Sequence, residues 1–233
     1  MKFSLLEHFL FKIIQNNPDF IVVSKPPDVN FHNENEDSGF FNIVRDYLKC
    51  ELYPVHRLDR ITSGVILFAK NKDAANKLSI LFRNREIDKY YIGLSDKKPV
   101  KKMGRIAGGM ERTRNGQWKL NRTSLNFSIT NFTSIKLSNG LTLFIIKPLT
   151  GRTHQIRVAL KSIGSPIIGD SLYYPSATEY DRGYLHSWSI HFKFKGRSYS
   201  FTDYPEYGNF FTDDAFKSVI NQNIKPDFFK MPR

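Results

Sequence analysis

The most informative stretch of the sequence is residues 56–69, HRLDRITSGVILFA. Its last five residues form a short, unbroken run of apolar β-forming side chains, which is typical of a strand buried on both faces. Before this run, Asp59 lies between Arg57 and Arg60. A carboxylate beside two guanidinium groups stays ionised, which suits a nucleophile or an anchoring charge. The alternative is a surface ion pair, which is the more common role of an aspartate in such a setting.

A second polar stretch, residues 150–157 (TGRTHQIR), opens a predicted helix over 153–163. Thr153 can cap this helix, and the free amides of its first turn can face an anion. His154 and Arg157 are three residues apart and therefore project from the same helix face. This face predicts an oxyanion contact. The alternative, which we favour for His154, is a helix end tied to its loop by ordinary hydrogen bonds.

A third stretch, residues 88–94 (DKYYIGL), reads as a strand. Alternation along a strand places Tyr90 and Tyr91 on opposite faces, so one ring can meet the core and the other an open cleft. The alternative is that both rings serve packing.

The rest of the chain predicts one α+β domain, residues 1–233, because it contains no internal repeat or long linker. Short apolar runs at 11–14 and 20–23 flank a turn, and Asn139-Gly140 is the strongest hairpin signal in the chain. The other expected elements are helices at 38–49, 74–82 and 213–222, and strands at 124–147, 188–194 and 197–202.

The composition is that of an ordinary globular protein, with 40% hydrophobic and 24% charged residues among 233, and it excludes a disordered or collagen-like chain. Lysine and arginine number 35 against 22 acidic residues, which gives a formal net charge of +13. Such a charge attracts polyanions, so nucleic acid is the leading class of partner. Charge alone does not name the ligand, because many basic proteins bind nothing specifically.

The basic charge is densest at residues 96–122, which hold nine basic residues against Asp96 and Glu111. Four glycines lie in the same segment, so we interpret it as a mobile basic insertion suited to phosphate groups. The alternative is a merely solvated loop. The basic residues are Lys97, Lys98, Lys101, Lys102, Arg105, Arg112, Arg114, Lys119 and Arg122.

The composition argues against disulfides, a thiolate zinc site, a signal peptide and a membrane span. Cys50 is the only cysteine, which excludes an internal disulfide and a thiolate zinc cluster and favours a reducing compartment. The apolar stretch from Leu5 to Ile14 is interrupted by charged residues and lacks a cleavage site, so we expect it to be core and not a signal peptide. No run of about 20 apolar residues exists, so we expect no membrane span and a cytoplasmic protein.

These stretches, in this order, resemble the RluA-type RNA pseudouridine synthases, which isomerise uridine in ribosomal and transfer RNA. The resemblance spans most of the chain, and its nucleophile motif (56–64) and arginine motif (151–158) are together highly specific. One departure is Pro27-Asp28, where the family usually has a small residue and a glycine. The basic segment 96–122 is not part of the shared pattern, and we expect no separate N-terminal RNA-binding domain. The other similar segments are 21–26, 88–93, 164–173 and 184–186.

The resemblance implies an α+β fold with a mixed, largely antiparallel central β-sheet, flanking helices and a central active-site cleft. It implies an isomerase, an intramolecular transferase, that converts a specific uridine of structured rRNA or tRNA to pseudouridine after flipping the base. It implies RNA as the partner and neither a cofactor nor a metal. We expect a monomer with no membrane association, and no protein partner is implied.

The resemblance also assigns site residues. Asp59 is the catalytic aspartate, Tyr91 is the ring against the target base, and Arg157 is the ion-pair partner of Asp59. Arg57 enters the RNA stack when the uridine flips out, and Leu185 is an apolar wall. The remaining residues expected to bind substrate are Arg60, Thr62, Arg152, His154 and Gln155.

Two rival functions stay open. One is a non-catalytic RNA-binding or ribosome-assembly protein that keeps the fold and the basic surface. The other is an RNA-cleaving or base-removing enzyme that uses Asp59 with His56 or His154 as acid and base.

Overall fold

The computed structural model describes residues 11–33, 38–113, 115–175, 180–221, 226 and 229–232. The chain forms two compact units, and each is assembled from two stretches of sequence. Among the described residues, no helix is long and apolar enough to cross a membrane. Part of the expected N-terminal core segment (Leu5, Leu6, Phe9 and Leu10) and Arg114 lie outside the described residues. The first unit is Met1–Asp88 with Ser189–Asp203, and the second is Lys89–Trp188 with Tyr204–Arg233.

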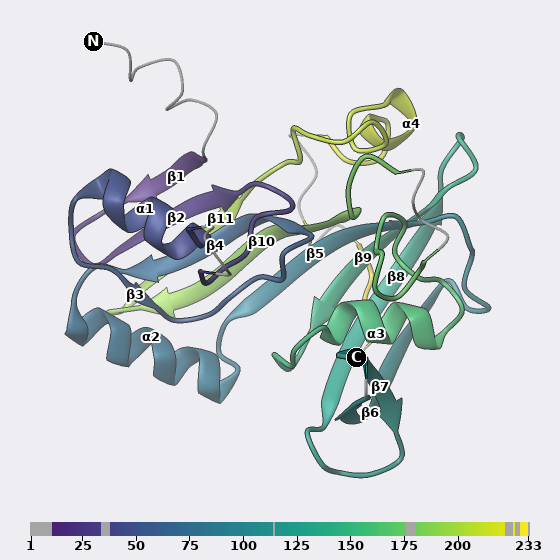
Figure 1. The fold of residues 1–233 in the computed structure, drawn as a ribbon, viewed down its shortest axis with the longest axis horizontal. Coiled ribbons are helices and arrows are strands. Elements are labelled where there is room, and N and C mark those ends of the chain that lie inside the picture. Colours follow the sequence, from purple (N-terminus) through teal and green to yellow (C-terminus); the bar gives the residue numbers. More distant parts are fainter. Residues whose placement is uncertain are drawn as a thin grey trace. The chain divides into compact units, whose positions relative to one another are not determined.

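The first unit is built on a mixed, largely antiparallel sheet with two helices (Figure 1). Its strands run in the order β1-β2-β4-β10, with β3 pairing with β4 and β11 with β10. Strand β10 begins in the second unit and enters the first at Ser189. The elements are β1 (Lys12–Asn16), β2 (Phe20–Lys25), α1 (Phe40–Leu48), β3 (Tyr53–Pro54), β4 (Thr62–Ala69), α2 (Lys72–Asn84), β10 (Leu185–Phe194) and β11 (Arg197–Thr202).

The two helices cover opposite faces of β4. Leu67 packs in one apolar cluster with Leu78 of α2. Phe68 points to the other face, where its ring meets Phe40 and Phe41 of α1. All eight residues of β4 are therefore buried, which confirms the strand predicted from its unbroken apolar run.

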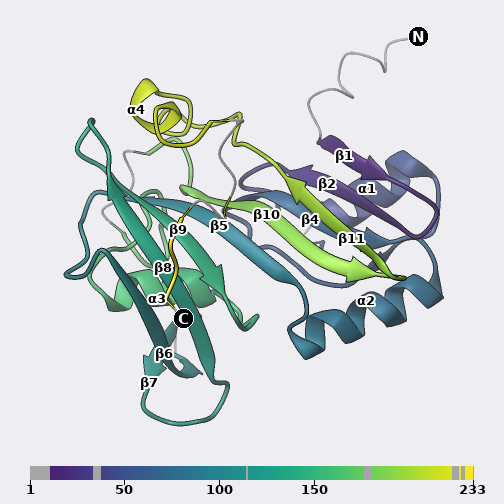
Figure 2. The same ribbon diagram turned by 180° about the vertical axis from the view of Figure 1, so that it is seen from behind.

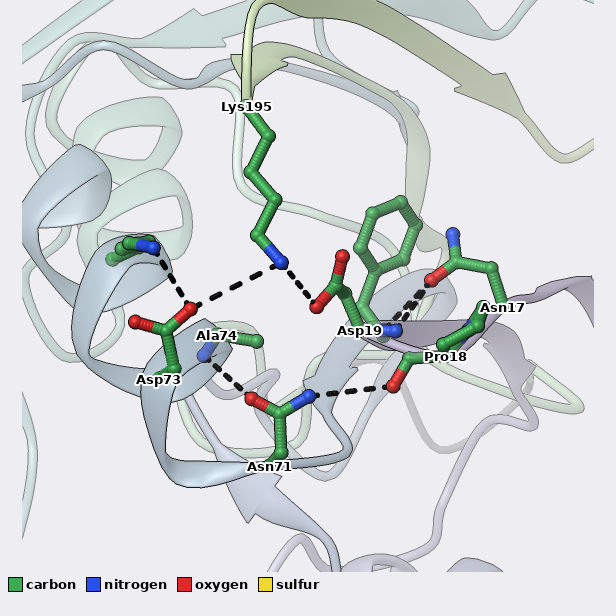
Figure 3. A network of polar contacts seen from close by, with 9 residues as sticks. Asn17, Pro18, Asp19, Asn71, Asp73, Ala74 and Lys195 are labelled. Carbon is green, nitrogen blue, oxygen red and sulfur yellow. Dashed lines mark hydrogen bonds and ion pairs between the residues drawn. The ribbon is translucent and has the colours of Figure 1, made fainter.

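Three turns of the first unit are tied together by one lysine (Figure 3). Lys195, in the β10–β11 turn, forms an ion pair of 2.7 Å with Asp19 in the β1–β2 turn and lies 4.0 Å from Asp73 in the first turn of α2. Asn71 caps the same helix by accepting the Ala74 N–H at 2.8 Å. The hydrogen bond from Lys195 lowers the pKa of the Asp19 carboxyl below its usual value.

The second unit is an antiparallel sheet in the order β5-β9-β8-β6-β7, with α3 packed against β7, β8 and β9. Figure 2 shows β9, β8 and β6 side by side. Together with the first unit, these pairings confirm the predicted α+β class and its largely antiparallel strands. The elements are β5 (Asp88–Ser95), β6 (Met103–Arg112), β7 (Trp118–Asn121), β8 (Ser128–Lys136), β9 (Thr142–Pro148), α3 (Gln155–Ser162) and α4 (Asp214–Lys217).

The predicted hairpins are present at the expected turns. Gly140 has a φ of 89° between β8 and β9, and Gly196 has a φ of 79° between β10 and β11, values that glycine adopts without steric cost. The final helix is shorter than the predicted 213–222, because α4 ends at Lys217; Gln222 lies outside the described residues. The single domain expected over residues 1–233 stays a prediction.

The basic segment 96–122 is a correction, because most of it is β-structure and not a mobile loop. β6 pairs with β8 on one side and with β7 on the other. Its glycines serve close packing: a Cβ on Gly109 would lie 2.5 Å from the Thr123 carbonyl oxygen, and one on Gly108 would lie 2.8 Å from that of Asn121.

Candidate active site

Asp59 lies in the loop that enters β4, and the backbone around it is fixed by a buried cation. The Lys25 side chain has no exposed surface. Its ammonium donates to the carbonyl oxygens of Pro26 at 2.9 Å, Arg60 at 3.1 Å and Thr62 at 3.0 Å. The Thr62 N–H in turn donates to the Asp59 carbonyl oxygen at 3.0 Å. The backbone that carries the Asp59 carboxylate is therefore held in one conformation.

The two arginines beside Asp59 are both exposed, and one of them connects two loops. Arg60 Nε donates to the Asp28 carbonyl oxygen at 3.3 Å. Asp28 has a φ of 60°, the left-handed conformation that a glycine adopts freely and an aspartate tolerates better than most residues. The aspartate at this departure from the family pattern therefore keeps the backbone shape that a glycine would give. Thr62 is 2% exposed, so little of its side chain is open to a ligand.

His56 is engaged by the fold. Its Nε2 accepts the backbone N–H of Leu67 at 2.9 Å, so this nitrogen carries no proton. Its ring stacks on Phe82 of α2 with centroids 4.6 Å apart. These contacts give His56 a structural role at the start of the nucleophile motif.

Arg157 forms a buried, two-pronged ion pair with Asp170. Nε lies 2.7 Å from Oδ2 and Nη2 lies 2.8 Å from Oδ1, with the two side chains 6% and 0% exposed. Asp170 also accepts the N–H groups of Leu172 and Tyr173, each at 3.2 Å. The guanidinium plane is thereby fixed. The predicted pair between Arg157 and Asp59 joins residues of different units and stays a prediction.

Sequence reasoning missed Asp170 as a site residue, although it lies in the family-like segment 164–173. An available signal was an acidic residue directly after the apolar run PIIG. A carboxylate in such surroundings is buried only with a cationic partner.

Tyr173 connects the arginine motif to the β6–β7 hairpin. Its hydroxyl accepts the Trp118 backbone N–H at 2.8 Å and lies 2.9 Å from His154 Nδ1. Its ring lies under the Arg157 guanidinium, 4.9 Å from centroid to Cζ. Since the Trp118 N–H occupies one lone pair, the hydroxyl proton can go to His154 Nδ1. His154 and Arg157 therefore both contact Tyr173, although His154 precedes the helix and does not lie on the predicted helix face.

The start of α3 differs from the prediction. The N-cap is His154, with a φ of 55° and no side-chain hydrogen bond to the helix, so the expected Thr153 cap is wrong. The buried Gln155 amide holds the loop instead. Its oxygen accepts the Thr150 hydroxyl at 2.7 Å and the Arg152 N–H at 3.0 Å. Its nitrogen donates to the Ile129 carbonyl and the Thr130 hydroxyl, each at 3.0 Å.

These four bonds use the donor and acceptor capacity of the Gln155 side chain within the protein. We therefore assign Gln155 to loop positioning and not to substrate contact. Of the residues expected to bind substrate in this motif, Arg152 is exposed and His154 is half-buried.

The strand that carries the two tyrosines buries both, each with 8% exposure. The Lys147 ammonium lies 5.1 Å above the Tyr90 ring. A Cβ on Gly93 would lie 3.6 Å from Leu185 Cδ1. Because residues two apart share a face of a strand, Leu185 lies on the face of β5 that carries Tyr91. The sequence predicted that one of the two tyrosine rings packs in the core while the other lies open, but the exposed fractions of Tyr90 and Tyr91 are equal.

Within the described ranges, no group of three or more His, Cys, Asp or Glu side chains is arranged to hold a metal ion.

Comparisons with known proteins agree on one class of enzyme. A family model described as RNA pseudouridylate synthase matches residues 19–162. The chain is 41% identical over 200 residues to a protein of Haemophilus influenzae named uncharacterized RNA pseudouridine synthase, covering 85% of this chain and 89% of that one. It is 30% identical over 168 residues to the ribosomal large subunit pseudouridine synthase C of Rickettsia bellii, covering 69% of this chain and 56% of that one.

A solved structure shows the same fold. Human RNA pseudouridylate synthase domain containing 1 superposes with a TM-score of 0.71 at 24% identity, covering 83% of this chain and 82% of that chain. Fold and matches together define an RNA-modifying isomerase. The chain belongs to the RNA pseudouridylate synthase family.

Proposed function

We propose that this protein converts a specific uridine of a structured ribosomal or transfer RNA to pseudouridine, with Asp59 as the catalytic carboxylate. The observation that carries the proposal is the rigid mount of Asp59, whose loop is held by the fully buried Lys25. Holding a reactive group in a fixed geometry lowers the entropic cost of reaching the transition state. We propose also that the protein acts as a monomer in the cytoplasm.

The reaction is a redox-neutral exchange of bonds within one nucleotide. The N1–C1′ bond breaks, the uracil turns in place, and a C5–C1′ bond forms; C5 then loses its proton, and N1, released from the sugar, gains one. These steps require an ionised carboxylate that attacks or stabilises the sugar or base intermediate, and a closed site that retains the free base.

The other site residues divide the remaining tasks. Tyr91 packs against the flipped uracil, and Leu185, on the same face of β5, is the apolar wall beside it. Arg157 is the ion-pair partner that keeps Asp59 ionised, and the buried pair with Asp170 fixes the arginine side chain. Arg57 is exposed and fills the gap that the flipped base leaves in the RNA stack.

A flipped base must first leave its stack, which costs a few kcal/mol and favours uridines in loops and bulges. The name of the Rickettsia bellii relative, a ribosomal large subunit pseudouridine synthase, makes ribosomal RNA the first substrate to test.

The hydrolytic rival is less well supported. His56 Nε2 is occupied by the Leu67 N–H, and His154 Nδ1 is bonded to Tyr173, so neither ring offers both nitrogens for acid and base work. The non-catalytic rival does not explain why a buried lysine should fix the loop of a carboxylate in an otherwise basic, polyanion-binding protein.

The test uses ribosomal and transfer RNA fractions from a deletion strain, labelled with tritium at uridine C5. Wild-type protein should release tritium from one fraction without producing free uracil or broken strands. Asp59→Asn should release none, whereas the control Asp46→Asn, at an exposed position of α1, should match the wild type. Tritium release by Asp59→Asn, or free uracil from the wild type, would contradict the proposal.

A further inference from the structure

A short loop of the second unit presents two large apolar side chains to solvent. The loop, residues 122–127, connects β7 to β8. Leu125 is 72% exposed and Phe127 is 41% exposed. Large apolar side chains that gather on a surface mark a binding site more often than they are accidental.

The loop is held in place by bonds to two other parts of the unit, β6 and Arg152. The Leu125 carbonyl oxygen accepts the Met110 N–H at 3.2 Å, and Asn126 Nδ2 donates to the Met110 carbonyl oxygen at 3.5 Å. The Phe127 carbonyl oxygen accepts Arg152 Nε at 3.3 Å. With the close glycine contact of β6 described above, these bonds fix the backbone while the Leu125 and Phe127 side chains point outward. A ligand that binds this loop does not pay the entropic cost of ordering its backbone.

The loop and its neighbours carry positive charge that no acidic side chain of the described chain neutralises. Residues 121–128 contain no acidic residue. Arg112 and Arg122 are exposed, and neither makes an ion pair within the described part of the chain. Glu111, the acidic residue of the β6–β7 hairpin, is already paired with Lys119 at 2.8 Å. Arg152 is also exposed and retains its terminal nitrogens for a ligand beyond Phe127.

An exposed aromatic ring on a loop with arginines that have no acidic partner in the described chain matches an unpaired nucleotide, which has a π face and a phosphate. A duplex hides its base faces by stacking, so it can use only the charges. A protein partner would need acidic groups to match the arginines and would gain less from a single exposed ring.

We propose that loop 122–127, with Arg152, binds an unpaired nucleotide of the substrate RNA: Phe127 stacks on the base, and Arg122 and Arg152 contact the phosphates. The identity of this RNA as a substrate rests on the proposed function. Arg152 lies five residues before Arg157, so the loop is connected to the arginine motif through the Phe127 carbonyl.

The stacking part is tested by fluorescence anisotropy with a labelled twelve-nucleotide oligouridylate and with a blunt RNA duplex of equal length. Phe127→Ala should weaken binding of the single strand by about 5- to 150-fold, and Phe127→Trp should restore it. Binding of the duplex should change little. Tyr207→Ala, at a side chain that is 50% exposed, is the matched control and should bind as the wild type does.

The phosphate part is tested by the salt dependence of the same binding. Arg122→Gln should reduce the slope of log K against log salt by about 0.7, the value expected for one lost phosphate contact on a single strand. Phe127→Ala should leave the slope unchanged. Arg83→Gln, at an exposed position of α2, is the control and should not alter it.

The inference is overturned if Phe127→Ala binds the oligouridylate as tightly as Tyr207→Ala, if duplex binding falls equally, or if the wild type does not bind the single strand. Its failure is distinct from failure of the proposed function, because the binding arm is read without turnover. If Phe127→Ala loses binding of the oligouridylate but the wild type releases no tritium, the nucleotide-binding role of the loop stands and only the proposed catalytic function is rejected. If the wild type releases tritium but Phe127→Ala binds the oligouridylate as the wild type does, the proposed function stands and the role of the loop is rejected.

Discussion

The two units of the chain carry very different charge. The first has 15 basic against 13 acidic residues, a net charge of +2, and the second has 20 against 9, a net charge of +11. Several surface cations of the first unit are paired with acids, such as Lys195 with Asp19 and Lys77 with Asp73. The second unit therefore supplies nearly all of the field that draws RNA, while the first can hold the Asp59 carboxylate in a nearly neutral frame.

The charge of the second unit is itself of two kinds. Arg157 is buried and neutralised by Asp170, so it contributes orientation and little long-range attraction. Arg112 and Arg122 are exposed and contribute attraction with no fixed partner in the described chain. A basic sequence thus divides into cations that build the site and cations that bring the RNA to it.

The sharpest way to break this division is Asp170→Asn. The substitution leaves the buried Arg157 charge without its counter-ion, which should lower the free energy of unfolding by about 3–5 kcal/mol. Urea unfolding measures this loss, with the exposed Asp214→Asn of α4 as control. A loss below about 1 kcal/mol would mean that Arg157 belongs with the attracting cations.

The same comparison predicts a different result in the first unit. Lys25→Met removes the donor from three carbonyl oxygens and should cost about 3 kcal/mol in urea unfolding. Turnover should fall with it, because the Asp59 loop loses its mount, but RNA affinity should not. The exposed Lys72→Met is the control. An equal fall in RNA affinity would show that RNA binding depends on the first unit as well.

Tyr173→Phe sharpens the account of the second unit. Loss of the hydroxyl leaves the Trp118 N–H without its acceptor, at a cost of about 1–2 kcal/mol. It should also free His154 to change tautomer, because Nδ1 loses its donor. Nitrogen chemical shifts of the ring read the tautomer directly, with Tyr207→Phe as control. Unchanged shifts in Tyr173→Phe would mean that the hydroxyl does not orient His154.

The smallest effect is expected at the surface ion pair of the first unit. The pKa of Asp19 is lowered by Lys195, so this stabilisation is present above the unfolded-state value of about 3.9 and is lost as the pH falls through the lowered folded-state pKa. Lys195→Met should reduce the Tm at pH 7 by no more than about 2 °C. The gap to the wild type should narrow toward pH 2. A gap that is equal at both pH values would contradict the assignment.

The parts of the fold that sequence predicted are those with local causes. The buried strand β4 followed from its unbroken apolar run, and the Asn139-Gly140 turn followed from the backbone freedom of glycine. Glycine also misled, because Gly108 and Gly109 indicated a loop but serve the close approach of a neighbouring backbone. That approach depends on residues elsewhere in the chain and has no local signal.

In the candidate site, too, the sequence predicted the features with local causes and missed those that depend on distant residues. Helical spacing predicted His154 and Arg157 on one helix face, but His154 precedes α3 with a φ of 55° and the two residues meet through Tyr173. The pairing of Arg157 with Asp170 requires a return of the chain that spacing does not reveal. The engagement of Gln155 by Thr150 and Thr130 likewise depends on the sheet. Residue types indicated where chemistry lies, and the packing decides which of them are available for it.

The central claim is that Asp59 performs the chemistry while most of the RNA affinity comes from the second unit. It is tested most directly by measuring turnover and RNA affinity in parallel for Asp59→Asn. We predict that turnover falls by at least about 10³-fold while the Kd for the same RNA changes by less than about twofold. Turnover that persists, or an affinity that falls together with turnover, would contradict the account.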